Sequence, residues 1–330
     1  MLPSDAKDSN IAKTVGAYVI QSYLSKGAYS LVYKGMHIKD KTLAAIKIIK
    51  KNCVPNFAPM MKELATEVSI MKRFNHPNII GVLDFMETTS NVYIVIQFCN
   101  NRDLQTYLQR NGLEFVKEEQ AVYFLRQIAS AFAALTSQNI VHRDFKLTNL
   151  CVHNDTLIVC DLGAGTQLKE DVSCKEFVGT PSYCAPELVE LYGNRNKGAK
   201  GYNSKVDLWA IGVSYYKLLF GRLPFKKCSM NQLRQVIHEN AGANLVIPRE
   251  INYISEESED LLRRMLTEDP AQRISWQEFF THPLFDRKDF NIIPLQEINE
   301  EIVNSMGHRY FFSFKFYKAS PAEDGPLIYT

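Results

Sequence analysis

Several features that mark other classes of protein are missing from this sequence. Its 330 residues contain no apolar run approaching the roughly 18 residues that a membrane span requires. Residues 1–18 are polar and mixed in charge, and they lack the apolar stretch of a signal peptide. No glycine follows Met1, and no prenylation box ends the chain. We therefore expect neither a signal peptide nor a lipid anchor, and we predict a cytoplasmic location.

An excess of charge of one sign is also absent. The formal net charge is only +2 at pH 7, whereas dedicated nucleic-acid-binding domains usually carry a strong basic excess. We expect no nucleic-acid partner.

Cysteine is present, but its pattern argues against disulfide frameworks and zinc sites. The seven cysteines are an odd number, and no C-x-x-C pair occurs among positions 53, 99, 151, 160, 174, 184 and 228. This usage predicts a reduced intracellular protein without a structural zinc. A hydrophobic content of 46% allows a large core that needs no such support.

The apolar pattern divides the chain into two parts. Residues 18–99 are rich in strand-like runs, with one helical segment at 59–74. Helical periodicity prevails from about residue 103 onward. We predict a bilobal α+β fold, with a small-molecule cleft where the lobes join near Gln97–Asn101. The predicted parts are an N-terminal extension at 1–17, an N-lobe at 18–99, a C-lobe at 100–285 and a tail at 286–330.

The segment 24–32 (LSKGAYSLV) is the first candidate for a ligand site. A tight hairpin with glycine can place backbone N–H groups close to phosphate oxygens. Gly27 keeps one glycine of a G-x-G-x-x-G-x-V pattern, while Ser25 and Ser30 replace the other two. Taken alone, the segment favours an ordinary hairpin.

Lys47 lies in an apolar strand, in Ala44-Ala45-Ile46-Lys47. A buried ammonium is costly unless a carboxylate accompanies it, and Glu67 on the following helix is the natural partner. Such a pair would hold Lys47 against the α- and β-phosphates of a nucleotide. A strand-end lysine in solvent is an equal alternative on the strand alone.

The decisive segment runs from Val141 to Leu150 (VHRDFKLTNL). Asp144 can accept a proton from a substrate hydroxyl, and Lys146 can neutralise charge on the transferred group. Asn149 and Asp161 can hold a metal ion. The ordered set of H-R-D-x-K-x-x-N, D-x-G, A-P-E and D-x-W, all present here, is too specific to arise by chance.

These motifs resemble the eukaryotic protein kinase domain, over about residues 18–285. The resemblance implies ATP and Mg²⁺ as cofactors, an active-state Lys47–Glu67 ion pair, Asp144 as catalytic base, and Asn149 and Asp161 as magnesium ligands. It implies a gatekeeper at Ile96 and a buried ion pair between Glu187 and Arg273. The residues implied at the ATP site are Leu24, Ser25, Gly27, Val32, Ala45, Lys47, Glu67, Gln97, Cys99, Asp103 and Cys151.

Two residues point to the serine/threonine class. Lys146 follows the catalytic Asp144 as in that class, and Thr180 lies in a Gly-Thr-Pro segment that resembles its substrate-docking loop. Residues 103–110 and 273–285 look most similar to the autophagy-initiating unc-type kinases. Calcium/calmodulin-dependent kinases have some similar sequence features. The tail, however, shows no basic amphipathic helix of the kind that binds calmodulin.

Glu176 departs from the family pattern in an informative way. It lies four residues before Thr180, where many kinases carry a threonine whose phosphate pairs with the arginine of the H-R-D motif. One hypothesis is that Glu176 pairs with Arg143 and orders the activation loop without phosphorylation. An exposed loop glutamate that contributes little is an equal alternative.

The sequence allows three functions. An active kinase acting on protein substrates is favoured, because Lys47, Asp144 and Asp161 are all retained. A scaffold that keeps the kinase fold and binds partners through its tail is the alternative. A small-molecule kinase is disfavoured by the docking segment at 179–187. The aromatic run at 310–317 predicts docking on the chain's own lobe, or on a regulatory partner.

Overall fold

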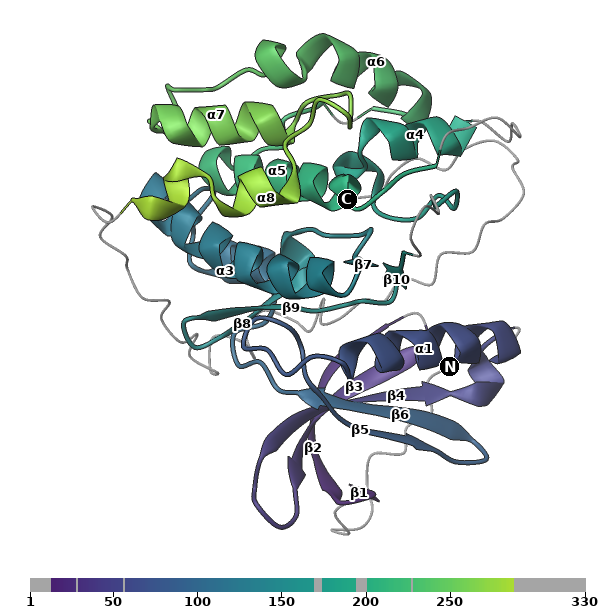
Figure 1. Ribbon diagram of the computed structural model, residues 1–330. Coiled ribbons are helices and arrows are strands. Elements are labelled where there is room, and N and C mark those ends of the chain that lie inside the picture. Colours follow the sequence, from purple (N-terminus) through teal and green to yellow (C-terminus); the bar gives the residue numbers. More distant parts are fainter. Residues whose placement is uncertain are drawn as a thin grey trace.

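The computed structural model describes residues 13–27, 29–55, 57–168, 174–193, 201–226 and 228–287. They form the bilobal α+β fold that the sequence predicts (Figure 1). A curled antiparallel sheet with helix α1 makes the small lobe, and the helices from α2 onward make the large lobe. The aromatic run at 310–317 lies outside the described residues.

The small lobe is a six-stranded sheet in the order β1-β2-β3-β4-β6-β5. Most apolar residues of the neighbouring strands β4 and β6 are buried. Edge strand β1 pairs with β2 through Thr14 and Val19. The strands are β1 (Thr14–Val15), β2 (Tyr18–Lys26), β3 (Ser30–His37), β4 (Leu43–Lys50), β5 (Val82–Glu87) and β6 (Asn91–Gln97).

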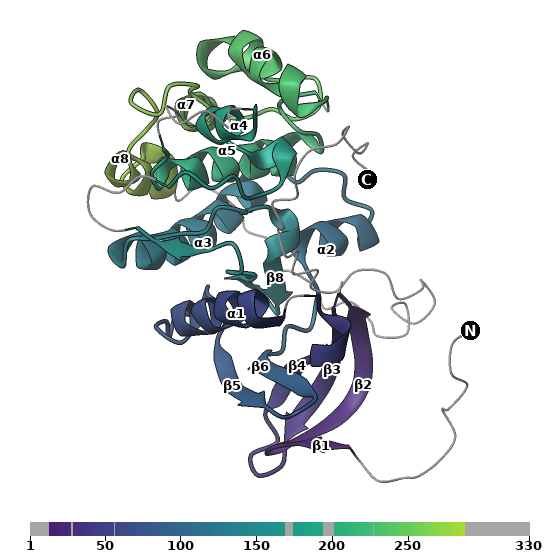
Figure 2. The same ribbon diagram turned by 90° about the vertical axis from the view of Figure 1, so that its right-hand side faces the viewer.

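Helix α1 (Phe57–Met71) packs on this sheet with one apolar face. Leu64, Val68 and Met71 are buried at helical spacing. The chain after α1 then contacts the large lobe, because the backbone of Ile80 and Asn78 bonds to that of Val159. This contact fixes the end of the small lobe beside the segment that leads to Asp161. Figure 2 shows α1 on the side of the small lobe that faces the large lobe.

The large lobe is built around helix α5, whose residues are nearly all buried. Such an all-round apolar helix belongs at the centre of a core, and the other helices surround it (Figure 1). The helices are α2 (Leu104–Arg110), α3 (Glu118–Ser137), α4 (Pro186–Gly193), α5 (Lys205–Phe220), α6 (Met230–Asn240), α7 (Glu256–Met265) and α8 (Trp276–Phe280). Two short antiparallel strand pairs belong to this lobe: β7 (Ile140–Val141) with β10 (Thr166–Gln167), and the hairpin of β8 (Leu150–His153) with β9 (Thr156–Val159).

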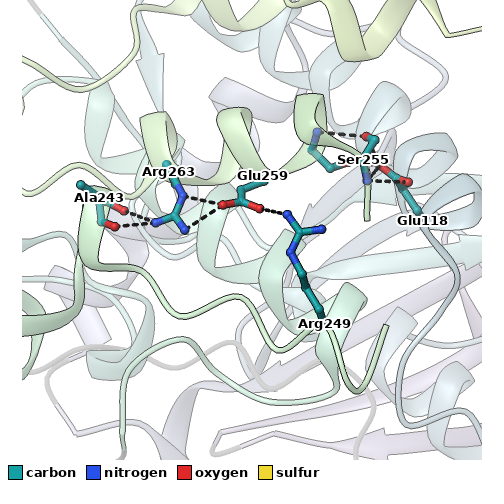
Figure 3. Close-up of polar contacts among 8 residues, drawn as sticks. Glu118, Ala243, Arg249, Ser255, Glu259 and Arg263 are labelled. Atoms are coloured by element: carbon teal, nitrogen blue, oxygen red, sulfur yellow. Dashed lines mark hydrogen bonds and ion pairs between the residues drawn. The ribbon is translucent and has the colours of Figure 1, made fainter. Parts of the chain in front are cut away.

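The carboxylates of Glu118 and Glu259 tie α7 to its neighbours (Figure 3). Glu118, at the start of α3, accepts hydrogen bonds from the backbone N–H of Ser255 at 3.1 Å and from its hydroxyl. On the other side of α7, Glu259 accepts two bonds from Arg263 at 2.8 and 3.0 Å and one from Arg249. The contacts of Glu118 satisfy a buried carboxylate that would be costly to bury alone.

Candidate active site

One face of the small-lobe sheet carries the residues predicted to cover a nucleotide. Cross-strand pairing places Ser25 opposite Val32, and Val32 opposite Lys47. Ala45 is two residues from Lys47 on the same strand, so the alternation of side chains puts it on the same face. Gly27 closes the hairpin through its N–H, which donates to Ser30 O at 2.8 Å.

Lys47 on this face and Glu67 on α1 are both buried, and their charges interact. Lys47 is 2% exposed and Glu67 4%. Burial lowers the pKa of Lys47 and raises the pKa of Glu67, and the attraction between the two charges opposes both shifts. The carboxylate of Asp161 also attracts Lys47. The solvated-lysine alternative is therefore wrong, because the ammonium lies buried among carboxylates.

The segment that carries Asp144 is held from below by Asp207 on α5. The Asp207 carboxylate accepts the backbone N–H of His142 at 2.7 Å and that of Arg143 at 2.9 Å. Burial raises the pKa of Asp207 to about 7, although these two hydrogen bonds act in the opposite direction. Arg143 has φ of 67°, an unfavourable conformation for a residue with a side chain. The bonds to Asp207 hold it there.

Asp144, Lys146 and Thr180 form a closed triangle of hydrogen bonds. The ammonium of Lys146 donates to Asp144 Oδ2 at 2.7 Å and to Thr180 Oγ1 at 2.6 Å. The Thr180 hydroxyl donates to Asp144 Oδ1 at 2.6 Å. The structure thus brings Thr180 into contact with a carboxylate that lies 36 residues earlier in the sequence and with the ammonium next to it.

Asn149 and Asp161 fit a magnesium site. The Asn149 amide nitrogen donates to Asp144 O at 2.8 Å, so its oxygen is the atom left for a ligand. Burial, and secondarily Asp144, raise the pKa of Asp161 to about 6, and a bound cation would favour its ionised form. Among the described residues no cluster of three His, Cys, Asp or Glu could hold a metal. Mg²⁺ binds with few protein ligands, its others being water and phosphate oxygens.

The junction between the lobes carries the predicted adenine residues. Gln97 ends β6, and its N–H donates to Gly81 O at 2.9 Å. Cys99 follows it and is buried, which raises the pKa of its thiol to about 12. Asp103 begins α2 as its N-cap and accepts the N–H of Thr106 at 2.9 Å. Cys151 on β8 forms a β-bridge with Asp103, and Leu24 is half-buried near the end of β2.

The activation segment is fastened by a residue that the sequence analysis missed. The hydroxyl of Tyr202 donates to Glu176 O at 3.0 Å, and Arg143 Nη1 donates to that hydroxyl at 3.3 Å. Arg143 also lies 3.5 Å from the Glu176 carboxylate, which is 79% exposed. Cys174 and Tyr202 exchange two backbone hydrogen bonds at 2.9 and 3.1 Å. In the sequence, only a tyrosine shortly before α5, Tyr202, could have indicated that this contact forms.

A second missed feature is the close approach of Gly179 to the catalytic loop. Gly179 has φ of 111°, and a Cβ there would lie 2.6 Å from Arg143 O. No side chain fits at that distance, so the Gly-Thr-Pro segment requires glycine at this position. Thr180 is thereby held beside Asp144.

The predicted ion pair between Glu187 and Arg273 is confirmed. The two side chains make parallel hydrogen bonds of 2.7 and 2.9 Å, and Arg273 is fully buried. This bidentate geometry is the strong form of an arginine–carboxylate contact. It attaches the start of α4, and with it the activation segment, to the large lobe.

Two of the seven cysteines lie in contact with each other. The sulfur atoms of Cys151 and Cys160 touch in the structure, while the remaining five cysteines are free. The sequence pattern did not indicate it, because the pairing depends on the register of β8 against β9.

Residues 18–285 match the protein kinase domain family. The chain belongs to the protein kinase family. Serine/threonine-protein kinase ATG1c of Arabidopsis thaliana is 33% identical over 284 residues, which cover 84% of this chain and 37% of that protein. Human serine/threonine-protein kinase ULK3 is 32% identical over 273 residues, 82% of this chain and 55% of that protein.

These relatives confirm the resemblance to unc-type serine/threonine kinases that the motifs indicated. Human serine/threonine-protein kinase ULK1 also matches, with 32% identity over 83% of this chain and 26% of its own length. The chain thus spans about a third to about half of ATG1c and ULK3. In the described part of this kinase, no helix is long and apolar enough to cross a membrane.

Proposed function

We propose that this kinase transfers the γ-phosphoryl group of ATP to serine and threonine hydroxyls of protein substrates. The observation that carries the proposal is the triangle of Asp144, Lys146 and Thr180, with bonds of 2.6 to 2.7 Å. A carboxylate held this way is placed to receive a hydroxyl proton, and the adjacent ammonium is placed to offset negative charge.

Each remaining group has a role in this proposal. Lys47, held by Glu67, would contact the phosphates, and Gly27 would offer a backbone N–H to them. Val32, Ala45 and Cys151 would enclose the adenine between the lobes, beside Gln97 and Cys99. Asn149 and Asp161 would hold Mg²⁺, which supplies charge neutralisation on the phosphates when bound.

In the chemical step Asp144 Oδ1 would exchange its bond from Thr180 for one from the substrate hydroxyl. The hydroxyl oxygen attacks phosphorus as its proton passes to Asp144, and the bond from phosphorus to the leaving oxygen of the nucleotide breaks. Lys146, already 2.7 Å from Asp144, would stabilise the transferred group. Thr180 would shape the site for a serine or threonine side chain.

The scaffold alternative makes a different prediction. A protein that only binds partners has no need of a connected Asp144–Lys146–Thr180 arrangement, which costs side-chain entropy to maintain. The aromatic run at 310–317, proposed to dock on a lobe or on a regulatory partner, lies outside the described residues. The complete triangle therefore favours catalysis, and activity decides between the two.

The test is transfer of radiolabel from ATP to a basic protein with magnesium, comparing wild type with Asp144→Asn. We expect wild-type label and a loss of roughly a hundredfold to ten-thousandfold in the variant, the usual contribution of a general base. Asp155→Asn, in the exposed turn between β8 and β9, is the matched control and should label normally. Wild type that binds ATP but transfers no label would favour the scaffold alternative.

A further inference from the structure

A β-bulge near the end of β2 turns Ser25 onto the face of the sheet that carries the proposed nucleotide site. Tyr23 is opposite Tyr33, and Ser25 is opposite Val32, so two steps along β2 match one step along β3. This count is that of a bulge with Leu24 as the extra residue, a device that re-aims side chains. Without the bulge, Ser25 would share the face of Tyr23, which is 38% exposed. With it, Ser25 shares the face of Val32.

Ser25 also lies in one cross-strand row with the lysine proposed to contact the phosphates. Val32 is opposite Ser25 on one side and opposite Lys47 on the other. Ala45, in the proposed adenine site, is two residues nearer the lobe junction on β4, a distance of about 6–7 Å along a strand. The row of Ser25 is therefore displaced from the junction toward the tip of the hairpin, where Lys47 and Gly27 would meet the phosphates.

The hydroxyl of Ser25 is buried and has nothing to bond to in the free chain. Ser25 is 2% exposed, and its Oγ has no hydrogen-bond partner within the part of the chain that the structure describes. Burying a hydroxyl without a hydrogen bond is costly, and folded proteins contain few such groups. The G-x-G-x-x-G pattern has glycine at this position, so the hairpin does not require a hydroxyl there. The unpaired donor points to a ligand.

We propose that the Ser25 hydroxyl donates a hydrogen bond to a phosphate oxygen of the bound nucleotide. The inference rests on the proposed function, because that function places the phosphates beside Lys47. A serine hydroxyl can donate one hydrogen bond, and a phosphate oxygen is a charged acceptor that makes such a bond strong. Ser25 is then a nucleotide-binding residue through its side chain, a contact that glycine at this position cannot make.

The ribose also offers oxygen atoms, so the experiment separates the two parts of the nucleotide. ADP carries the ribose and two phosphates, whereas adenosine carries the ribose alone. A bond from Ser25 to a phosphate strengthens the binding of ADP and leaves that of adenosine unaffected. A bond to the ribose strengthens both equally.

The first measurement is the Kd of ADP with magnesium, and of adenosine, for the full chain and for Ser25→Ala. We expect ADP binding to be weakened roughly tenfold to a hundredfold, as for loss of a hydrogen bond to a charged group. Adenosine binding should not change. Ser22→Ala is the matched control, because Ser22 is an exposed serine on the same strand. It should bind ADP as wild type does.

Thermal melting distinguishes a ligand-binding hydroxyl from a structural one. In the free chain, Ser25→Ala removes an unpaired buried hydroxyl, so its melting temperature should equal or exceed that of wild type. Saturating ADP should raise the melting temperature less in the variant, because weaker binding stabilises less. A structural hydroxyl would give the opposite result, a lower melting temperature for the free variant and an unchanged shift with ADP. If Ser25→Ala does not fold, Ser25→Gly, with the residue of the kinase pattern, takes its place.

Three outcomes would count against these assignments. Unchanged ADP affinity in Ser25→Ala overturns the proposal, because the hydroxyl then contributes nothing to binding. An equal loss for ADP and adenosine also overturns it, because the contact would then be to the ribose. Wild type that binds neither ADP nor adenosine overturns the proposed function instead, whatever the variant does.

Discussion

The two halves of the site are held in place by different forces. In the large lobe, Asp144, Lys146 and Thr180 are linked by hydrogen bonds of 2.6 to 2.7 Å, and Asp207 supports the loop beneath them. In the small lobe, Lys47 and Glu67 are held by burial and by mutual attraction. One oxygen of Glu67 is buried and accepts no hydrogen bond from the residues that the structure describes.

This difference indicates which half depends on the nucleotide. Hydrogen bonds fix direction as well as distance, so the large-lobe groups are aimed before any substrate arrives. Coulomb attraction has little directional preference, and a buried charge gains most from a further partner of opposite sign. The phosphates of ATP would be that partner for Lys47. We therefore expect changes in the large lobe to affect turnover or loop stability, and changes in the small lobe to affect ATP affinity.

The largest expected effect concerns Asp207 and pH. Its pKa is raised from 3.8 to about 7 by burial, so the folded state holds a proton that the unfolded state releases. Stability from this group is therefore greatest at low pH and is lost as pH rises from about 4 to about 7. At 1.36 kcal/mol for each pKa unit, the loss is about 4 kcal/mol.

Urea unfolding of wild type and Asp207→Asn across this pH range measures the loss. The variant carries no titrating group there, so the wild-type advantage in free energy of unfolding should shrink as pH rises. A difference that stays constant with pH would show that Asp207 is ionised throughout, held so by the N–H groups of His142 and Arg143. Asp207, which supports the loop that carries Asp144, would then be charged in the folded protein, like the Lys47–Glu67 pair.

A smaller effect is expected from Glu67→Gln in the small lobe. The change keeps the shape of the side chain and removes the charge that attracts Lys47. The KM for ATP should rise roughly tenfold to a hundredfold, with a smaller change in kcat. Glu63→Gln, exposed on the same helix, is the control and should leave both constants unchanged. A fall in kcat at constant KM would contradict the expectation that changes in the small lobe affect ATP affinity and changes in the large lobe affect turnover.

Much of this fold could be predicted from the sequence because its elements are strongly periodic. Helix α5 is mostly apolar, and helix α3 has an apolar stripe over 20 residues. These patterns identify both segments as helices. The short strands β7 and β10 have two residues each. Such strands carry no periodic pattern, and they exist only because the surrounding lobe brings them together.

The site shows the same limit. Lys47, Asp144, Asn149 and Asp161 could be chosen from ordered motifs, since each belongs to a local pattern of residue types. The support from Asp207 could not, because it joins groups 64 and 65 residues apart. The hydroxyl of Tyr202 and the Cys151–Cys160 pair depend likewise on register and approach, which local sequence does not encode.

The smallest expected effect tests whether Glu176 replaces a loop phosphate. Its carboxylate is 3.5 Å from Arg143 but 79% exposed, and such exposed pairs contribute at most about 1 kcal/mol. Glu176→Ala should therefore lower the activity of unphosphorylated enzyme by no more than about fivefold, an effect of that energy. Unchanged activity would mean that the carboxylate has no ordering role.

Tyr202→Phe provides the comparison that gives this small effect its meaning. The buried hydroxyl of Tyr202 donates to Glu176 O and accepts from Arg143, so its removal leaves two polar groups without that partner. A larger loss of activity for Tyr202→Phe than for Glu176→Ala would show that the activation segment is ordered by directional hydrogen bonds, as in the rest of the large-lobe half. Equal or greater loss for Glu176→Ala would show instead that charge attraction orders the activation segment, as it holds Lys47 and Glu67.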